Sequence, residues 1–247
     1  MNASTYEPGT LYGIGTGPGD PELMTLKAVR HLRDCPVVAY FTKRGGNGNA
    51  FRTASEHIGR EQEKLPLVYP VTTEIPHGCP QYLDLIERFF DDSAAEVAGH
   101  LECGRSVAVL SEGDPFFYGS FMHVFLRLQG RFPSCVVPGV PAMLAGSALL
   151  PRPITMRDDV MTVIPGTLPD GDMLAALKGA DAAVIMKVGR NLPRIRQALR
   201  ALGLEERAWY IERASMAAEK LLPFIEAPED AAPYFSMVLI PGHGERR

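Results

Sequence analysis

The sequence predicts an α/β protein with two α/β domains, and three observations lead to this fold class. Residues 11–23 read as an apolar strand, a glycine-rich loop and a helix start, and an apolar strand at 37–41 completes a βαβ unit. A second apolar strand, at 106–110, also runs into a Gly-Asp-Pro turn before a helix. Strands and helices alternate again in the second half of the chain. We therefore expect one domain at residues 1–128 and another at 129–247.

The first helix start carries clear capping chemistry. Asp20 can cap the helix with its carboxylate, and Pro21 fits the first helical position because the N–H that it lacks would have no partner there. Glu22 suits the positive end of the helix dipole. The pattern predicts one helix that continues through apolar residues spaced three to four apart, namely Met24, Leu26, Val29 and Leu32.

The glycine loop does not match a dinucleotide-binding fingerprint. A G-x-G-x-x-G match begun at Gly13 ends on Pro18. A match begun at Gly15 ends on Asp20, whose carboxylate also opposes a pyrophosphate at the helix start. Residues 36–41 lack the acidic side chain that would hold a ribose. These mismatches weaken a nucleotide-dependent dehydrogenase as an interpretation, while a loop that only makes a tight turn remains an alternative.

The rest of the first half supplies a second loop of the same kind. A glycine-rich basic loop at 43–51 leads into a short helix, and a plain surface loop is the alternative interpretation. A strand at 65–70 and a long amphipathic helix at 81–102 follow. Because ligands of open α/β sheets gather at the carboxyl ends of strands, the two Gly-Asp-Pro turns suggest one shared crevice.

The second half continues the alternation with short elements. A strand at 134–137 runs into a Pro-Gly turn and a helix of small residues. Further strands are predicted at 160–164, 182–186, 208–211 and 235–240. Helices near 171–178 and 192–202 lie between them. The economical interpretation is a second α/β domain.

Composition excludes several classes of function. The 247 residues are 46% hydrophobic and 22% charged, and the net charge of −4 argues against nucleic acid as a partner. The four cysteines include no C-x-x-C pair, which predicts reduced thiols in the cytoplasm. The histidines have no metal-ligand spacing, so no metal is expected. No signal peptide is evident, and the most apolar stretch, 136–150, is too short to span a bilayer, so no membrane is expected as a partner.

Taken together, the sequence resembles the tetrapyrrole methylase family, and the matching segments follow one another over nearly the whole chain. They are residues 15–28, 112–120, 138–140 and 212–216. Segments at 48–50, 68–74, 113–121 and 185–193 resemble the branch of the family that acts on precorrin-2. One departure is Pro141-Ala142, where the family usually carries Ser or Thr. The resemblance implies two α/β domains with S-adenosylmethionine bound in the cleft between them.

The implied reaction is direct methyl transfer from the sulfonium of S-adenosylmethionine to the nucleophilic C(20) meso carbon of precorrin-2, giving precorrin-3A in cobalamin biosynthesis. The enzyme would mainly hold donor and acceptor in line and keep water away. A cobalt-bearing tetrapyrrole or a different ring carbon is the alternative within the fold, and a non-catalytic binding protein is the alternative outside it. The resemblance also implies a homodimer.

The same resemblance assigns site residues. The donor would be lined by residues of the loops after the first-domain strands and by strand ends of the second domain: Pro18, Gly113, Asp114, Phe117, Ser120, Ala142, Met143, Met186, Ala214 and Gly242. Plain core packing is the alternative for the two methionines. Asp20 is the candidate base for the meso proton, with helix capping as its alternative. The carboxylate arms of the tetrapyrrole are a separate matter of charge: because the protein is net negative, local positive charge must hold them, and we expect Lys43, Arg44 and Arg52 beside the glycine-rich loop to do so.

Overall fold

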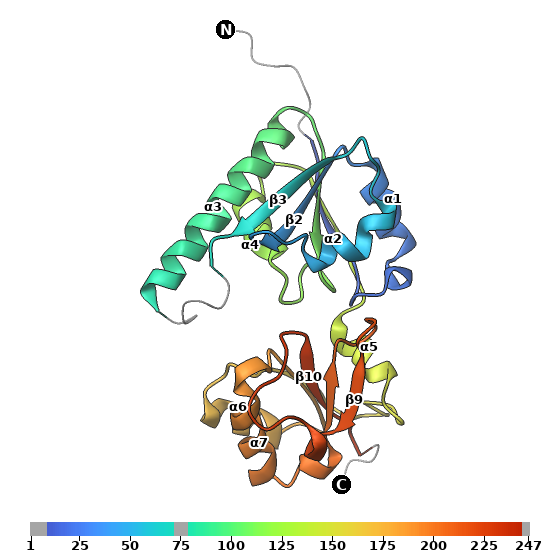
Figure 1. The fold of residues 1–247 in the computed structure, drawn as a ribbon, viewed down its shortest axis with the longest axis vertical. Helices are drawn as coiled ribbons and strands as arrows, with labels where there is room; N and C mark the ends of the chain where they lie inside the picture. The colour runs from blue at the N-terminus through green and yellow to red at the C-terminus, as the bar shows by residue number, and fades with distance from the viewer. Residues whose placement is uncertain (1–8, 72–78, 244–247) are drawn as a thin grey trace. The chain divides into compact units, whose positions relative to one another are not determined.

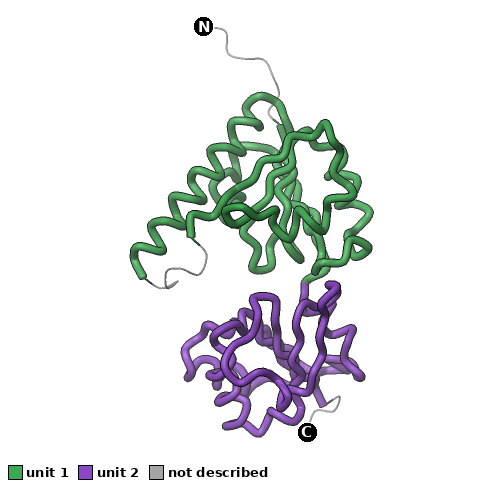
Figure 2. The backbone as a smooth tube through the Cα atoms, in the orientation of Figure 1, with its two compact units in different colours: residues 1–141 green, residues 142–247 purple. Residues whose placement is uncertain are grey.

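The computed structural model describes residues 9–71 and 79–243, and the chain divides into two compact units (Figure 2). The first unit comprises residues 1–141 and the second residues 142–247. Each unit has its own five-stranded sheet, so the predicted α/β fold class is confirmed. No helix within the described ranges is long and apolar enough to cross a membrane.

The first unit contains an all-parallel sheet in the order β3-β2-β4-β1-β5 (Figure 1). Its strands are β1 (Leu11–Gly15), β2 (Val37–Lys43), β3 (Glu63–Tyr69), β4 (Val107–Ser111) and β5 (Ser134–Val137). Its helices are α1 (Leu26–Asp34), α2 (Asn49–Ala54), α3 (Pro80–Glu102) and α4 (Phe121–Leu128), with short 3-10 turns η1 (Pro21–Leu23) and η2 (Ser55–His57).

Helices cover both faces of this sheet, which explains why its central strands read as unbroken apolar runs. Apolar residues of α3 and α4 pack with alternate residues of β2 and β4, such as Val37, Val107 and Val109. Residues of α1 and α2 pack with the opposite set, which includes Val38 and Leu110. Every residue of β4 is buried. The carboxyl ends of all five strands therefore emerge at one edge of a rigid layer.

The predicted first helix was wrong in one respect, because it is two elements. Asp20 caps only the 3-10 turn η1, where its Oδ1 accepts from the N–H of Glu22 at 2.9 Å. Met24 is extended, with φ −71° and ψ 135°, and ends that turn. Thr25 then caps α1, because its Oγ1 accepts from the N–H of Ala28 at 3.1 Å. Two successive capping signals thus replace one continuous helix.

The second unit contains a mixed sheet in the order β6-β7-β10-β8-β9. Its strands are β6 (Met161–Pro165), β7 (Ala182–Met186), β8 (Trp209–Glu212), β9 (Lys220–Pro223) and β10 (Ser236–Ile240). Only β6 and β7 pair in parallel, and the other three pairings are antiparallel. Its helices are α5 (Ala142–Ala148), α6 (Asp170–Lys178) and α7 (Leu192–Ala201), with 3-10 turns η3 (Gly189–Asn191), η4 (Glu205–Arg207) and η5 (Phe224–Glu226). The edge strand β9 was not predicted.

The division between the units lies after residue 141 rather than at the predicted position after residue 128. The reason is the pairing of β5, which follows residue 128 in sequence but lies beside β1, with Leu11 opposite Ser134 and Ile14 opposite Val137. The strand therefore completes the first sheet, and the chain enters the second unit only at α5.

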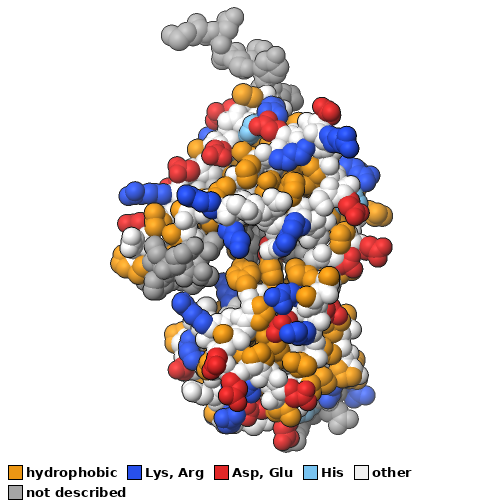
Figure 3. Space-filling view, in the orientation of Figure 1, with side chains coloured by type: hydrophobic (Ala, Val, Ile, Leu, Met, Phe, Trp, Pro, Cys, Tyr) orange, Lys and Arg blue, Asp and Glu red, His pale blue; other side chains and the backbone are white. Residues whose placement is uncertain are grey.

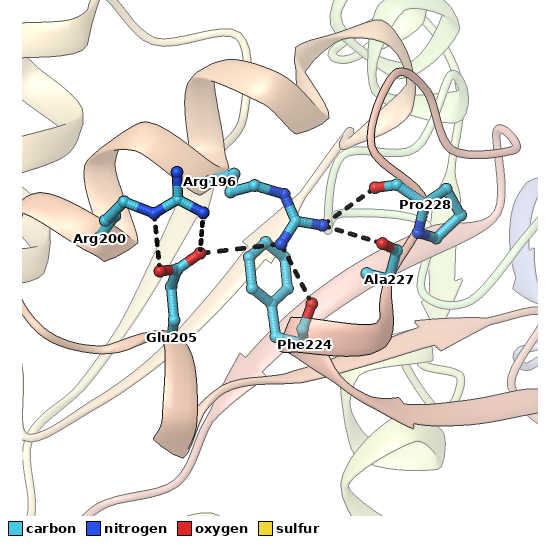
Figure 4. Close-up of polar contacts among 6 residues, drawn as sticks. All are labelled: Arg196, Arg200, Glu205, Phe224, Ala227 and Pro228. Atoms are coloured by element: carbon cyan, nitrogen blue, oxygen red, sulfur yellow. Dashed lines mark hydrogen bonds and ion pairs between the residues drawn. The ribbon is translucent and has the colours of Figure 1, made fainter.

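An arginine clamp holds η5 against α7 in the second unit (Figure 4). The guanidinium of Arg196 lies 4.7 Å from the ring centroid of Phe224. It donates to the backbone oxygens of Phe224, Ala227 and Pro228 at 3.4, 2.9 and 3.0 Å. Its Nη1 also lies 3.7 Å from Oε1 of Glu205. Together with the burial of Phe224 in the core of the second unit, the clamp fixes the segment after β9.

The structure predicts that Arg196→Met lowers the free energy of unfolding by roughly 2 kcal/mol, because hydrogen bonds from a charged donor to several carbonyls are lost. Arg200→Met is the matched control, since its side chain is 68% exposed, against 14% for Arg196, and it pairs with the same Glu205. An exposed pair of this kind contributes ~0–1 kcal/mol. Equal losses for the two variants in urea unfolding would contradict the clamp.

Candidate functional site

The loops that follow β1 and β4 are joined by backbone hydrogen bonds at the carboxyl edge of the first sheet. Thr16 donates twice to the carbonyl oxygen of Ser111, from its N–H at 2.9 Å and from its hydroxyl at 3.1 Å. Gly17 and Gly113 then form an antiparallel bridge, with N–H to O distances of 2.8 and 3.3 Å. The two Gly-Asp-Pro loops therefore lie side by side, and the shared crevice expected from them stays a prediction.

Close backbone approach explains the glycines of this edge. Gly17 and Gly113 have φ values of 77° and 63°, a region that favours glycine. A Cβ added to Gly139, in the loop after β5, would lie 2.1 Å from the carbonyl oxygen of Gly113. One added to Gly15 would lie 2.5 Å from the nitrogen of Gly139. The loops after β1, β4 and β5 therefore pack backbone against backbone, and we call them the loop rim.

Asp114 ties two parts of the loop rim together. Its Oδ1 accepts from the N–H of Phe116 at 2.9 Å, and its Oδ2 accepts from the N–H of Gly139 at 3.1 Å. The carboxylate therefore links the loop after β4 to the loop after β5. Each oxygen retains further lone pairs, so this structural role leaves room for a ligand contact.

The other first-unit residues of the predicted donor site also lie on the loop rim. Pro18 is buried in the loop after β1. The ring of Phe117 lies 4.9 Å from that of Tyr118, edge to face. The hydroxyl of Ser120 forms a hydrogen bond with the hydroxyl of Tyr69, at the end of β3. The structure therefore brings these predicted residues to one edge of one sheet.

Asp20 and the three basic residues expected to hold the substrate also lie at the carboxyl edge of the first sheet, but their surroundings differ. The carboxylate of Asp20 performs the capping that was its alternative role, and catalysis by it stays a prediction. Lys43 is the exposed last residue of β2, and Arg44 follows it. Arg52, exposed on α2, donates to Oδ1 of Asn49. Segment 68–74, one mark of the resemblance, lies outside the described residues from position 72 onward.

Sequence reasoning missed Glu112, the residue between β4 and the Gly-Asp-Pro turn. Its side chain is exposed, so ligands can reach it, but surrounding protein atoms are dense enough that desolvation raises the pKa of its carboxyl. A hydrogen bond from Asn49 and the charge of Arg52 act in the opposite direction and lower this pKa. The available signal was the Gly48-Asn49-Ala50 segment, whose asparagine proves to be a partner of Glu112.

Four predicted donor-site residues of the second unit share one apolar cluster. Ala214 is a buried member, and Ala142, Met143 and Met186 pack against it while remaining partly exposed. This arrangement also agrees with core packing, the alternative stated for the methionines. The structure thus brings these four residues to one face of the second sheet.

Gly242 does not lie with them. Strand β10 runs antiparallel to β7. The residues that follow β10 therefore lie beside the start of β7, whereas Met186 lies at its end. The N–H of Gly242 donates to the carbonyl oxygen of Ile154 at 2.8 Å. A Cβ added to it would lie 2.2 Å from Oδ2 of Asp159. The structure therefore contradicts the expectation that Gly242 lines the same wall.

A buried carboxylate fixes the turn that presents Ala214. Glu212 is 5% exposed and accepts from the hydroxyl of Tyr210 at 3.0 Å and from Nη1 of Arg213 at 3.2 Å. Lys220 lies 3.5 Å from the same carboxylate. Burial raises the pKa of the Tyr210 hydroxyl, so it stays a donor to the carboxylate.

Across residues 9–71 and 79–243, no group of three His, Cys, Asp or Glu side chains could hold a metal ion.

Comparison with known proteins gives consistent matches. The family model for Tetrapyrrole (Corrin/Porphyrin) Methylases matches residues 10–226. A precorrin-2 C(20)-methyltransferase from Sinorhizobium sp is 49% identical over 96% of this chain and 97% of that protein. A cobalt-precorrin-2 C(20)-methyltransferase from Salmonella typhimurium is 27% identical over 94% and 96%. The structure of uroporphyrin-III C-methyl transferase from Thermus thermophilus complexed with S-adenyl homocysteine is similar with a TM-score of 0.65, 26% identity and coverage of 94% and 92%.

The contacts of Asp114 predict that Asp114→Ala costs about 1–3 kcal/mol of folding free energy, because two backbone N–H groups lose their acceptor. Asp114→Asn keeps one carbonyl oxygen, so we expect an intermediate loss. Glu96→Ala, which removes an exposed carboxylate of α3, is the control. Denaturant unfolding of the three variants is the measurement, and an alanine variant as stable as the parent would remove the structural role.

Proposed function

Since the chain belongs to the tetrapyrrole methylase family, we propose that it is an S-adenosylmethionine-dependent methyltransferase that methylates C(20) of precorrin-2 to give precorrin-3A in cobalamin biosynthesis. The observation that carries the proposal is the 49% identity to the Sinorhizobium enzyme, which extends over nearly the full length of both chains. At this identity and coverage the resemblance includes both units rather than a single shared motif.

The metal-free substrate is favoured over its cobalt-bearing counterpart. The relative from Salmonella typhimurium, whose name specifies cobalt-precorrin-2, has only 27% identity over similar coverage.

A reduced tetrapyrrole is electron-rich at its meso carbons, so no nucleophilic side chain is needed. The protein then contributes alignment of the two reactants and exclusion of water.

The donor fits the chemistry of the residues assigned to it. S-adenosylmethionine supplies a methyl group on a sulfonium, which leaves as S-adenosylhomocysteine once the methyl group has moved to carbon. In the first unit, the loop rim offers backbone groups and small residues at Pro18 and Gly113. In the second unit, Ala142 and Met186 offer a partly exposed apolar wall, with the buried Ala214 behind them in the same cluster. Apolar and backbone-rich surfaces suit an adenine and a sulfonium better than a bare anion. The expected cleft between the domains stays a prediction.

We also propose that the protein acts in the cytoplasm as a homodimer. The described cysteines, Cys35, Cys79, Cys103 and Cys135, all have free thiols, as is usual in a reducing compartment. The dimer follows from the family resemblance alone. Light scattering coupled to gel filtration tests it directly, and a mass equal to that of one chain would remove it.

The test of the function is the product. The protein is incubated with precorrin-2 and S-adenosylmethionine labelled with ¹³C in its methyl group, and the product is analysed by mass spectrometry and NMR. We expect one added methyl group, attached to C(20). A methyl group on another carbon, or methylation of cobalt-precorrin-2 only, would replace the proposal by its alternative within the fold.

A prediction about charge concerns Lys43 and Arg44. A tetrapyrrole with several carboxylate arms must be attracted by a protein of net charge −4, and positive and negative side chains are mixed on the face that Figure 3 shows. The positive field therefore has to be local. Removing both side chains as alanines should raise the KM for the tetrapyrrole and flatten the dependence of kcat/KM on ionic strength, while donor affinity stays unchanged.

Lys27→Ala combined with Arg30→Ala is the matched control, because it removes the same charge from exposed positions of α1. If the two double variants behave alike in steady-state kinetics across a salt series, the loop after β2 is a solvated surface loop. An exposed loop of that kind contributes little, since its ion pairs are worth ~0–1 kcal/mol.

A further inference from the structure

The loop rim carries three carboxylates, and they differ in the groups that surround them. Asp20 accepts a hydrogen bond from the N–H of Glu22, and Asp114 accepts from two backbone N–H groups. Both therefore serve the shape of the loops. Glu112 differs, because its carboxylate accepts from the side chain of Asn49 and lies within the influence of the Arg52 charge.

The backbone of Glu112 is fixed more firmly than that of an ordinary loop residue. Ser111, immediately before it, accepts two hydrogen bonds from Thr16. Gly113, immediately after it, is bridged to Gly17. A side chain that starts from so constrained a position can be aimed with little loss of conformational freedom, which is what a residue that acts on a bound substrate requires.

The side-chain partners of Glu112 come from the neighbouring strand connection. Asn49 and Arg52 belong to α2, which follows β2, and β2 pairs directly with β4. The two partners are joined to each other, because Arg52 donates to Oδ1 of Asn49. Glu112, Asn49 and Arg52 therefore form a connected polar cluster at the carboxyl edge of the first sheet, close to the basic loop that begins at Lys43.

We infer that Glu112 is the base that accepts the proton from C(20) of the substrate after methyl transfer, and that Asn49 is its positioning residue. This inference rests on the proposed function. In the first step an electron pair of the ring forms the bond from C(20) to the methyl carbon, and the bond from sulfur to that carbon breaks with its electrons left on sulfur. In the second step the bond from C(20) to hydrogen breaks, its electrons return to the ring, and the proton passes to the Glu112 carboxylate.

The electrostatics of the cluster agree with this role. Desolvation raises the pKa of Glu112, and a carboxylate whose pKa approaches the working pH is a stronger base than an ordinary glutamate. The positive charge of Arg52 opposes this shift, because it lowers the pKa of Glu112. In Asp20, by contrast, one carboxylate oxygen is engaged in capping η1, where it accepts from the N–H of Glu22.

The test compares Glu112→Gln with the parent protein on precorrin-2 carrying hydrogen or deuterium at C(20). For the glutamine variant we expect kcat to fall by about 100-fold or more, since positioned bases contribute at least that factor. We also expect a primary isotope effect in kcat, larger than in the parent, because proton removal becomes rate-limiting. Affinity for S-adenosylhomocysteine, measured by calorimetry, should not change. Glu56→Gln, an exposed carboxylate of η2, is the matched control.

The pH profile separates a base from a merely structural residue. The parent should lose kcat as the pH falls through the raised pKa of Glu112, and Glu112→Asp should keep this acid limb at reduced kcat. Asn49→Ala removes a hydrogen bond that lowers the pKa, so the acid limb should move to higher pH. A glutamine variant with parental kcat, with a raised KM alone, or with no isotope effect would overturn the inference. Failure of the parent to methylate C(20) would instead overturn the proposed function.

Discussion

The antiparallel bridge between Gly17 and Gly113 is the interaction on which the rest of the first unit's site depends. Two parallel strands cannot exchange hydrogen bonds beyond their ends unless their loops turn towards each other, and the bridge accomplishes this directly after β1 and β4. Each bond contributes only about 1 kcal/mol to folding. Its larger effect is geometric, because it fixes the loops in which Pro18, Glu112 and Asp114 lie.

The parts of the fold that could be predicted are those whose burial leaves a continuous signal. Strands such as β4 and β7 are covered on both faces, so unbroken apolar runs indicate them. The short edge strand β9, Lys220–Pro223, pairs on one side only and carries no such run. The first helix was misjudged because Asp20 and Thr25 both offer caps, and the sequence does not say that Met24 turns extended between them.

The same distinction decides which features of the candidate site could be predicted: those that depend on one segment of sequence could, and those that depend on the pairing of distant segments could not. The position of the Gly-Asp-Pro loops at one edge of the first sheet could be predicted because each motif lies within one segment, directly after a strand. Gly242 could not be placed, since the direction of β10 depends on pairing with β7 and β8, which no local pattern specifies. Glu112 was overlooked for a related reason. Its partners Asn49 and Arg52 are distant in sequence and approach it only because β2 and β4 are neighbours in the sheet.

The distribution of charge at the loop rim reconciles an acidic protein with an anionic substrate. Of the three carboxylates there, Asp20 and Asp114 direct their oxygens at backbone N–H groups, which partly neutralise them. Glu112 differs, because the positive charge of Arg52 acts on its carboxylate. The exposed Lys43 and Arg44 are thus opposed by less negative charge than a count of residues suggests. The groups that interact with these carboxylates, more than the net charge of −4, determine the electrostatic field that a tetrapyrrole meets at this edge of the sheet.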